Sequence, residues 1–110
     1  MYTVEVAFPW QRYTYSQPGS SVIVNCTTES SDISAAWLIR LPGRENFNQF
    51  AIPASRMTLN DQGFYEFGID TVIQLQINNT VGKNGTVIRC IDASSSTTIA
   101  ETILIVDGNV

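Results

Sequence analysis

The segment NCTTESSDISAAW, residues Asn25–Trp37, decides the fold, because it joins a cysteine to a tryptophan that follows eleven residues later. It connects two runs in which apolar and polar residues alternate, a pattern typical of strands that bury one face. In Ser21–Cys26 (SVIVNC) the alternation puts Cys26 on the inward face, and in Ala35–Arg40 (AAWLIR) it puts Trp37 there. We interpret the Ser-rich residues between the two runs as a surface loop.

Further short runs rich in Val, Ile and Thr occupy most of the remaining chain, separated by Gly, Pro, Asn and Ser. In Thr86–Ile91 (TVIRCI), Cys90 shares the inward face with Thr86 and Ile88. The other predicted strands are Val4–Trp10, Asn48–Ile52, Gly63–Gly68, Thr71–Asn78 and Ile99–Asp107. Eight or nine short strands at this spacing predict an all-β chain that folds as a two-sheet antiparallel β-sandwich.

Composition sets the size of the protein and excludes several classes of function. The 110 residues suffice for a single domain, residues 1–110, and the 44% hydrophobic and 15% charged content is typical of a globular chain. The net charge of −4, without a basic cluster, argues against a nucleic-acid partner. No apolar run approaches the length of a membrane-spanning helix, so we expect no direct membrane insertion by this segment.

Catalysis and metal binding are both unexpected from the residue types present. The chain has no histidine, which removes Ser-His-Asp and Cys-His catalysis and His-ligated metal sites. Its two cysteines cannot form a structural zinc site by themselves. We also find no paired nucleophile and base and no phosphate-binding Gly loop. We therefore expect no catalytic residue, no metal and no cofactor, and a protein that is not an enzyme.

Cys26, Trp37 and Cys90 together resemble the Cys…Trp…Cys pattern of immunoglobulin domains. In that family a disulfide joins the two sheets and the Trp packs against it. The resemblance therefore implies a Cys26–Cys90 disulfide and a core position for Trp37. Trp37–Gly43 (WLIRLPG) is similar to the strand C to C′ segment of variable-type (V-set) domains, with the I-set as the second assignment. The resemblance covers essentially the whole chain, and it implies an excerpt of a larger extracellular protein.

Two features depart from the variable-type pattern. Asn84, Thr86 and Ile88 stand where the family often has Asp, Gly and Tyr, so the tyrosine corner before the second cysteine is missing. The last strand also lacks the Phe-Gly-x-Gly bulge of rearranged antigen receptors, which argues against an antibody or T-cell-receptor variable domain. A cytosolic β-sandwich with two buried thiols is the alternative that these residues leave open.

Three N-x-[ST] patterns, at Asn25, Asn78 and Asn84, are candidate glycosylation sites. Because Cys26 and Ile77 are predicted to point inward, Asn25 and Asn78 are predicted to point outward. The resemblance places these two on strands B and E of one sheet, and Asn84 in the turn before strand F. We therefore expect an extracellular glycoprotein, since a disulfide also indicates an oxidising compartment.

The opposite sheet, formed by strands C, C′, F and G in the resembled fold, is predicted to present an unusually apolar outer face. An apolar patch with some charged residues tends to mark an interface, and none of the glycosylation patterns lies on this one. The candidate binding residues are Leu38, Arg40, Val87, Arg89, Ile91, Ile103 and Ile105. The same phase puts Ile99 and Glu101 outward. Two alternatives are an inverted phase of the last strand and coverage of the face by the C′ loop or by neighbouring domains.

An aromatic cluster occupies Phe8–Tyr15 (FPWQRYTY), where Pro9 interrupts the first predicted strand. We interpret the segment as one kinked strand. Its Trp10, Tyr13 and Tyr15 are expected mainly to cover the edge of the core, with a role as contact hot spots as the alternative.

Two functional hypotheses follow. The first is an extracellular protein–protein recognition module of a cell-surface adhesion or receptor protein, with immune recognition included. It would bind another protein through its C–C′–F–G face, either a second copy of itself or a related immunoglobulin-like domain. The second is a structural spacer module of a multidomain matrix or filament protein, in which neighbouring domains cover the face.

Overall fold

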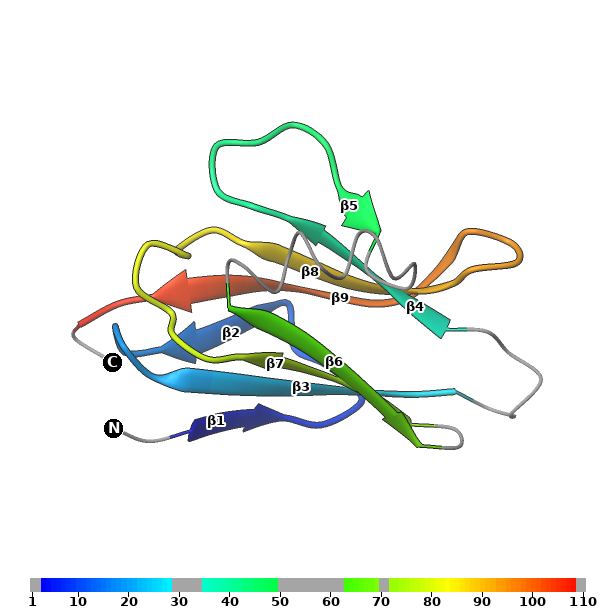
Figure 1. Ribbon diagram of the computed structural model, residues 1–110, viewed down its shortest axis with the longest axis horizontal. Coiled ribbons are helices and arrows are strands. Elements are labelled where there is room, and N and C mark those ends of the chain that lie inside the picture. The colour runs from blue at the N-terminus through cyan, green and yellow to red at the C-terminus, as the bar shows by residue number, and fades with distance from the viewer. Residues whose placement is uncertain (1–2, 29–34, 50–62, 70–71, 109–110) are drawn as a thin grey trace.

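Two β-sheets pack face to face in the computed structural model of the protein (Figure 1). The structure describes residues 3–28, 35–49, 63–69 and 72–108, and for 48–49, 67–69 and 72 it describes the backbone alone. The strands are β1 (Thr3–Val6), β2 (Tyr13–Ser16), β3 (Ser21–Thr27), β4 (Ala35–Arg40), β5 (Asn48–Gln49), β6 (Phe64–Ile69), β7 (Val72–Ile77), β8 (Val87–Asp92) and β9 (Thr97–Val106).

The strand orders are β1-β3-β7-β6 in one sheet and β2-β9-β8-β4-β5 in the other. The predicted two-sheet β-sandwich is therefore confirmed, and the arrangement is consistent with an immunoglobulin-like sandwich. The sheets are not wholly antiparallel, because β1 pairs with β3 in parallel and β2 pairs with β9 in parallel. The other pairs run antiparallel as the sequence predicts.

The core forms between the sheets from the inward residues of the alternating runs. Along β3 every second residue is buried, and Val22, Val24 and Cys26 have no exposed surface. β-branched side chains pack well on such a pleated surface, which is why these short runs form strands. The buried core cluster comprises Val22, Val24, Cys26, Trp37, Ile39, Leu41, Phe64, Leu75, Ile77, Ile88, Cys90 and Leu104.

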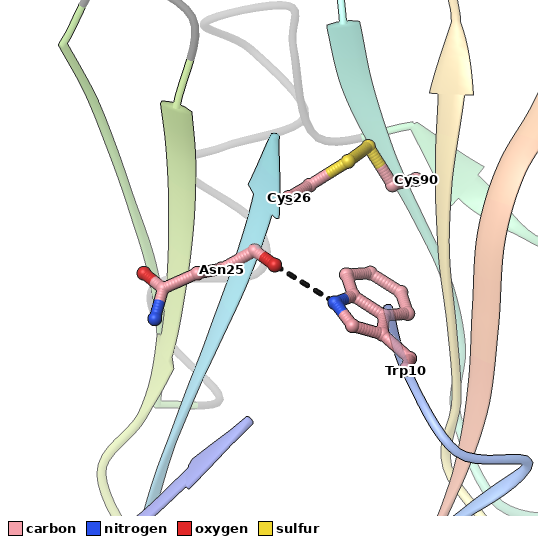
Figure 2. Close-up of a disulfide and its surroundings, with 4 residues drawn as sticks. All are labelled: Trp10, Asn25, Cys26 and Cys90. Atoms are coloured by element: carbon pink, nitrogen blue, oxygen red, sulfur yellow. Dashed lines mark hydrogen bonds between the residues drawn. A yellow bond between two sulfur atoms is a disulfide. The ribbon is translucent and has the colours of Figure 1, made fainter. Parts of the chain in front are cut away.

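A disulfide between Cys26 of β3 and Cys90 of β8 joins the two sheets inside this core (Figure 2). Trp37 lies opposite Cys90 in the β4–β8 register and is fully buried. The disulfide pairing and the core position of Trp37 are therefore confirmed. Ile88, which stands at the position of the missing tyrosine, is also fully buried, so an aliphatic side chain fills that part of the core.

The N-terminal segment differs from the single kinked strand that the sequence predicts. After β1 the chain reverses direction, and β2 joins the opposite sheet (Figure 1). Between them, the ring of Trp10 stacks on that of Trp37, with 5.7 Å between ring centroids and 1° between ring planes. Its Nε1 donates a hydrogen bond of 2.8 Å to the backbone oxygen of Asn25 (Figure 2). Packing this ring against the core takes the chain out of the sheet and separates β1 from β2.

Strand β9 contains an irregularity that the alternation does not predict. Its register against β8 shifts between Cys90 and Ile91, which leaves Ile99 as an extra residue of β9. Ile99 packs against the core, so the expectation that it points outward is wrong. Beyond the shift the predicted phase holds, because Thr102 and Leu104 are fully buried.

Predicted strands that border the undescribed segments are confirmed only in part. The run Asn48–Ile52 begins with β5, whose bounds are Asn48–Gln49, and its remaining residues lie outside the described part of the chain. The run Gly63–Gly68 forms β6 with bounds shifted by one residue at each end. Phe64 points into the core with no exposed surface.

Candidate protein-binding face

The predicted binding residues lie on the outer face of the five-stranded sheet, in rows that cross its strands. One row joins Leu38 of β4, Arg89 of β8 and Glu101 of β9. The next row consists of Arg40, Val87, Ile103 and Tyr13. Residues that are distant in the sequence thus share one surface, because cross-strand neighbours on one face lie within side-chain reach.

The centre of this face is charged and is built around an aromatic ring. Phe47, just before β5, lies against the guanidinium groups of Arg89 and Arg40, whose Cζ atoms are 4.3 Å and 5.5 Å from the ring centroid. Arg89 Nε also donates to Glu101 Oε2 at 2.6 Å, and the two side chains are 30% and 38% exposed. Stacking on Phe47 and pairing with Glu101 both favour this orientation of the Arg89 guanidinium.

Val87 and Ile91 have the outward phase but little accessible surface, with exposed fractions of 4% and 5%. Both belong to β8, which has a neighbouring strand on each side, β4 and β9. Val87 is flanked in register by Arg40 and Ile103, both of them longer side chains. These two side chains lie below the accessible residues of the face and offer a partner little contact area.

The apolar part of the face extends onto β2, which sequence reasoning assigned mainly to the edge of the core. Tyr13 and Tyr15 lie in register with Ile103 and Ile105 and are 37% and 52% exposed. Their rings are 6.3 Å apart, and Arg12 Cζ lies 5.4 Å from the Tyr13 centroid. The signal for this arrangement is the alternation of Tyr-Thr-Tyr-Ser, whose Thr and Ser are buried.

We call the accessible outer residues of these strands, together with Phe47, the candidate face. Its members are Tyr13, Tyr15, Leu38, Arg40, Phe47, Arg89, Glu101, Ile103 and Ile105. Phe47 was missed at the sequence level because a loop residue has no strand phase from which its direction could be predicted.

The loop between β8 and β9 is short and internally hydrogen-bonded. Oδ1 of Asp92 accepts bonds from the backbone nitrogen and the hydroxyl of Ser94, at 3.0 Å and 2.7 Å. The backbone oxygen of Asp92 accepts a hydrogen bond of 2.7 Å from the backbone nitrogen of Ser96. The bonds from Ser94, and then those from Ser95, lower the pKa of the Asp92 carboxyl from its ordinary value. Because the β8–β9 loop is short and compact, it offers a partner less contact surface than the sheet face does.

The candidate glycosylation sites lie on other parts of the surface. Asn25 lies on β3 with its side chain directed away from the core (Figure 2), where Nδ2 donates to Glu5 Oε1 at 3.3 Å and Oδ1 accepts from Gln74 Nε2 at 2.9 Å. Asn78 follows β7 and is exposed, and its Oδ1 accepts from Gln76 Nε2 at 3.0 Å. Both asparagines belong to the sheet opposite the candidate face.

Asn84 is exposed in the loop that joins β7 to β8. Its Oδ1 accepts a hydrogen bond of 2.9 Å from the backbone nitrogen of Val106 at the end of β9. The side chain therefore has a structural role that uses only its oxygen. A glycan is carried by Nδ2, so this bond and glycosylation are compatible.

The sequence matches no protein-family model and no curated protein. The described part of the chain contains no helix long and apolar enough to cross a membrane. Within those same residues, no three side chains among Cys, Asp and Glu gather closely enough to hold a metal ion.

Proposed function

We propose that this protein is an extracellular recognition module of a cell-surface adhesion or receptor protein, and that it binds another protein through the candidate face. The observation that carries the proposal is the accessible mixture of Tyr, Leu, Ile and Arg side chains on the sheet opposite Asn25 and Asn78. Single exposed apolar residues are common, whereas a contiguous set over several strands tends to mark an interaction site.

The composition of the candidate face suits protein recognition. Tyr and Arg are over-represented among residues that dominate binding energy, because they combine a large apolar surface with a polar end. Arg89 is already oriented by Phe47 and Glu101, so it loses less conformational freedom on binding than an unrestrained arginine would. Aromatic residues and arginine are enriched in protein interfaces, and Tyr13, Phe47 and Arg89 supply these residue types on the candidate face.

The finer assignment to the variable-type immunoglobulin domains also belongs to this proposal. It is supported by β5 beyond β4, at the place of strand C′, and by the parallel β2–β9 pair at the edge of the same sheet. The parallel β1–β3 pair and Ile88 at the tyrosine position are the departures from that pattern.

An extracellular location is supported by two observations. The Cys26–Cys90 disulfide is of a kind that persists in oxidising compartments. Asn25, Asn78 and Asn84 lie at the surface in patterns that accept N-linked glycans. A secreted glycosylated domain exposes the candidate face to partners on other cells.

A binding experiment with matched variants tests the proposal. The biotinylated domain, secreted from eukaryotic cells, is assembled into tetramers and applied to a cell panel. Leu38→Glu places a charge in the candidate face, and Val81→Glu makes the same kind of change at an apolar residue that is 60% exposed in the β7–β8 loop. Binding lost with Leu38→Glu and kept with Val81→Glu supports the proposal. Equal binding by both variants would contradict a role for the candidate face, whereas no binding by the wild type would favour a spacer module.

A further inference from the structure

Strand β2 forms one end of the five-stranded sheet, with β9 on one side and no described strand on the other. Two hydrogen bonds fix which of its backbone groups face β9: the backbone nitrogen of Ile103 donates to the oxygen of Arg12 at 2.9 Å, and that of Asp107 donates to the oxygen of Ser16 at 2.9 Å. In a parallel pair, alternate residues bond to the same neighbour. The backbone N–H and C=O groups of Tyr13 and Tyr15 therefore point away from the sheet.

Apart from its length of only four residues, this edge lacks the features that usually prevent edge-to-edge pairing. Edge strands are commonly protected by a charged residue, a proline or extreme shortness. Among the described edge strands, β1 contains Glu5, β6 contains Glu66 and β5 has only two residues. β2 contains only Tyr, Thr and Ser, all compatible with a strand.

The space beside β2 is open. A groove of about 380 Å³ runs between β2 and β1, lined on the β2 side by Tyr13, Thr14 and Tyr15. Because β1 belongs to the other sheet, it does not occupy the position next to β2 in the plane of the five-stranded sheet. The groove is space along this edge of the five-stranded sheet that is unoccupied by the described residues.

We propose that two copies of this protein pair through their β2 strands, antiparallel, across a two-fold axis at Thr14. This register sets Tyr13 of each copy opposite Tyr15 of the other. Both are residues whose backbone groups point off the edge, so each such pair exchanges both of its N–H···O bonds. The two five-stranded sheets become one continuous sheet. The proposal does not depend on the proposed function, because the pairing is made by backbone groups at the edge of the sheet, although the Tyr13 and Tyr15 side chains also belong to the candidate face.

Side chains and charge favour a second copy over an unrelated strand as the occupant. The pairing brings four tyrosine rings together on one surface, as two cross-strand aromatic pairs. It also sets the Arg12 end of each strand beside the other copy's Ser16, whose backbone oxygen is bonded to Asp107. Arg12 of each copy thus lies about two strand spacings, or ~10 Å, from Asp107 of the other copy, so opposite charges face one another at both ends of the pair. The antiparallel two-fold arrangement is the one that makes this edge complementary to itself.

The small contact area between the two β2 strands indicates a weak dimer. A pair of four-residue strands buries less than the ~1,600 Å² of a standard stable interface. We therefore expect a reversible dimer that forms in the micromolar-to-millimolar range, which display of many copies on one surface would reinforce.

Sedimentation equilibrium over a concentration series tests this dimer with Tyr15→Pro. Proline removes the Tyr15 N–H, which points off the edge, and leaves the bonds between β2 and β9 in place. We expect the dissociation constant to rise by at least about tenfold, with an unchanged value for Leu38→Glu on the face. A wild type that stays monomeric into the millimolar range, or a dimer unaffected by Tyr15→Pro, would overturn the proposal. Thermal unfolding of each variant confirms that it is folded.

A charge-complementation experiment tests the register. One variant carries Tyr13→Lys with Tyr15→Lys, and a second carries Tyr13→Glu with Tyr15→Glu. Each alone sets like charges opposite one another and is expected to be monomeric, whereas an equimolar mixture sets opposite charges together and is expected to form heterodimers. A mixture as monomeric as its two components contradicts the Tyr13–Tyr15 pairing. Because these positions are exposed, loss of folding does not account for that result.

Discussion

At the scale of single residues, Trp10 has a larger role than its place in an irregular segment indicates. Its ring is stacked on Trp37 beside the disulfide, and its Nε1 bonds to the backbone of β3. It therefore closes the sandwich at the side where β1 and β2 separate. The residues around it, Pro9 and Gln11, contribute no comparable contact to the core cluster.

We expect Trp10→Ala to lower the free energy of unfolding by about 3 kcal/mol, at the low end for loss of a large aromatic because the ring is only partly buried. Trp10→Phe should cost less, about 1 kcal/mol for the lost hydrogen bond together with some lost contact. Urea unfolding monitored by circular dichroism measures both. Equal stability of Trp10→Ala and the wild type would show that the stack does not contribute to the fold.

Asn84 allows its structural role to be separated from glycosylation. Asn84→Ala removes the acceptor of the Val106 N–H bond and should cost about 1 kcal/mol in protein produced without glycans. Asn84→Asp keeps the acceptor oxygen and also removes the N-x-[ST] pattern, so its stability should stay near that of the wild type at neutral pH. If both variants lose the same stability, the Oδ1 bond is not the cause.

At the scale of elements, the β8–β9 loop gives a prediction about pH. Hydrogen bonds from Ser94 lower the pKa of Asp92 in the folded protein, so its folded pKa lies below its unfolded pKa. The stabilisation is therefore present above the ordinary carboxyl pKa and is lost as the pH falls through the lowered value. Ser94→Ala should move the Asp92 pKa back toward its ordinary value. An NMR titration of the Asp92 carboxyl carbon measures its pKa in the wild type and in Ser94→Ala. Identical pKa values in the two proteins would show that the Ser94 hydroxyl does not lower the Asp92 pKa.

The strands that the sequence predicts well are those that carry apolar or cysteine side chains at the inward positions of the alternation. β3, β4, β7 and β8 are of this kind, because each buries one face against the opposite sheet. β1 and β2 were predicted as one strand because period-two alternation records the direction of side chains and not the sheet that a strand joins. The burial of Trp10, which separates them, is a tertiary contact with Trp37.

The candidate face was predictable in phase but not in exposure. Alternation correctly grouped Leu38, Arg89 and Ile103 on one surface of the sheet. It could not show that Val87, in an interior strand, is covered by its longer neighbours, or that Phe47 packs under the arginines from a loop. These two features depend on side-chain length and loop path, which a period-two pattern does not encode.

At the scale of the whole molecule, the disulfide links the two sheets between residues 64 positions apart in the chain. Closing so long a loop restricts the unfolded chain and, in the loop-entropy account, contributes about 4 kcal/mol to stability. The double variant Cys26→Ala/Cys90→Ala should lose stability of this order, and denaturant unfolding measures the loss. A loss below about 1 kcal/mol would show that packing around Trp37 suffices without the covalent link.

We propose that this protein meets its partner through the outer face of the five-stranded sheet. The most direct test places a glycan on that face with Leu38→Asn/Arg40→Thr, which creates the pattern Asn-Ile-Thr on β4. Tetramers of this variant, with glycan occupancy verified by mass spectrometry, are compared with wild-type tetramers for binding to the same cells. We predict that the added glycan abolishes binding, whereas removal of the N-x-[ST] patterns at Asn25 and Asn78 leaves binding intact. Undiminished binding by a fully occupied, folded variant would contradict the claim.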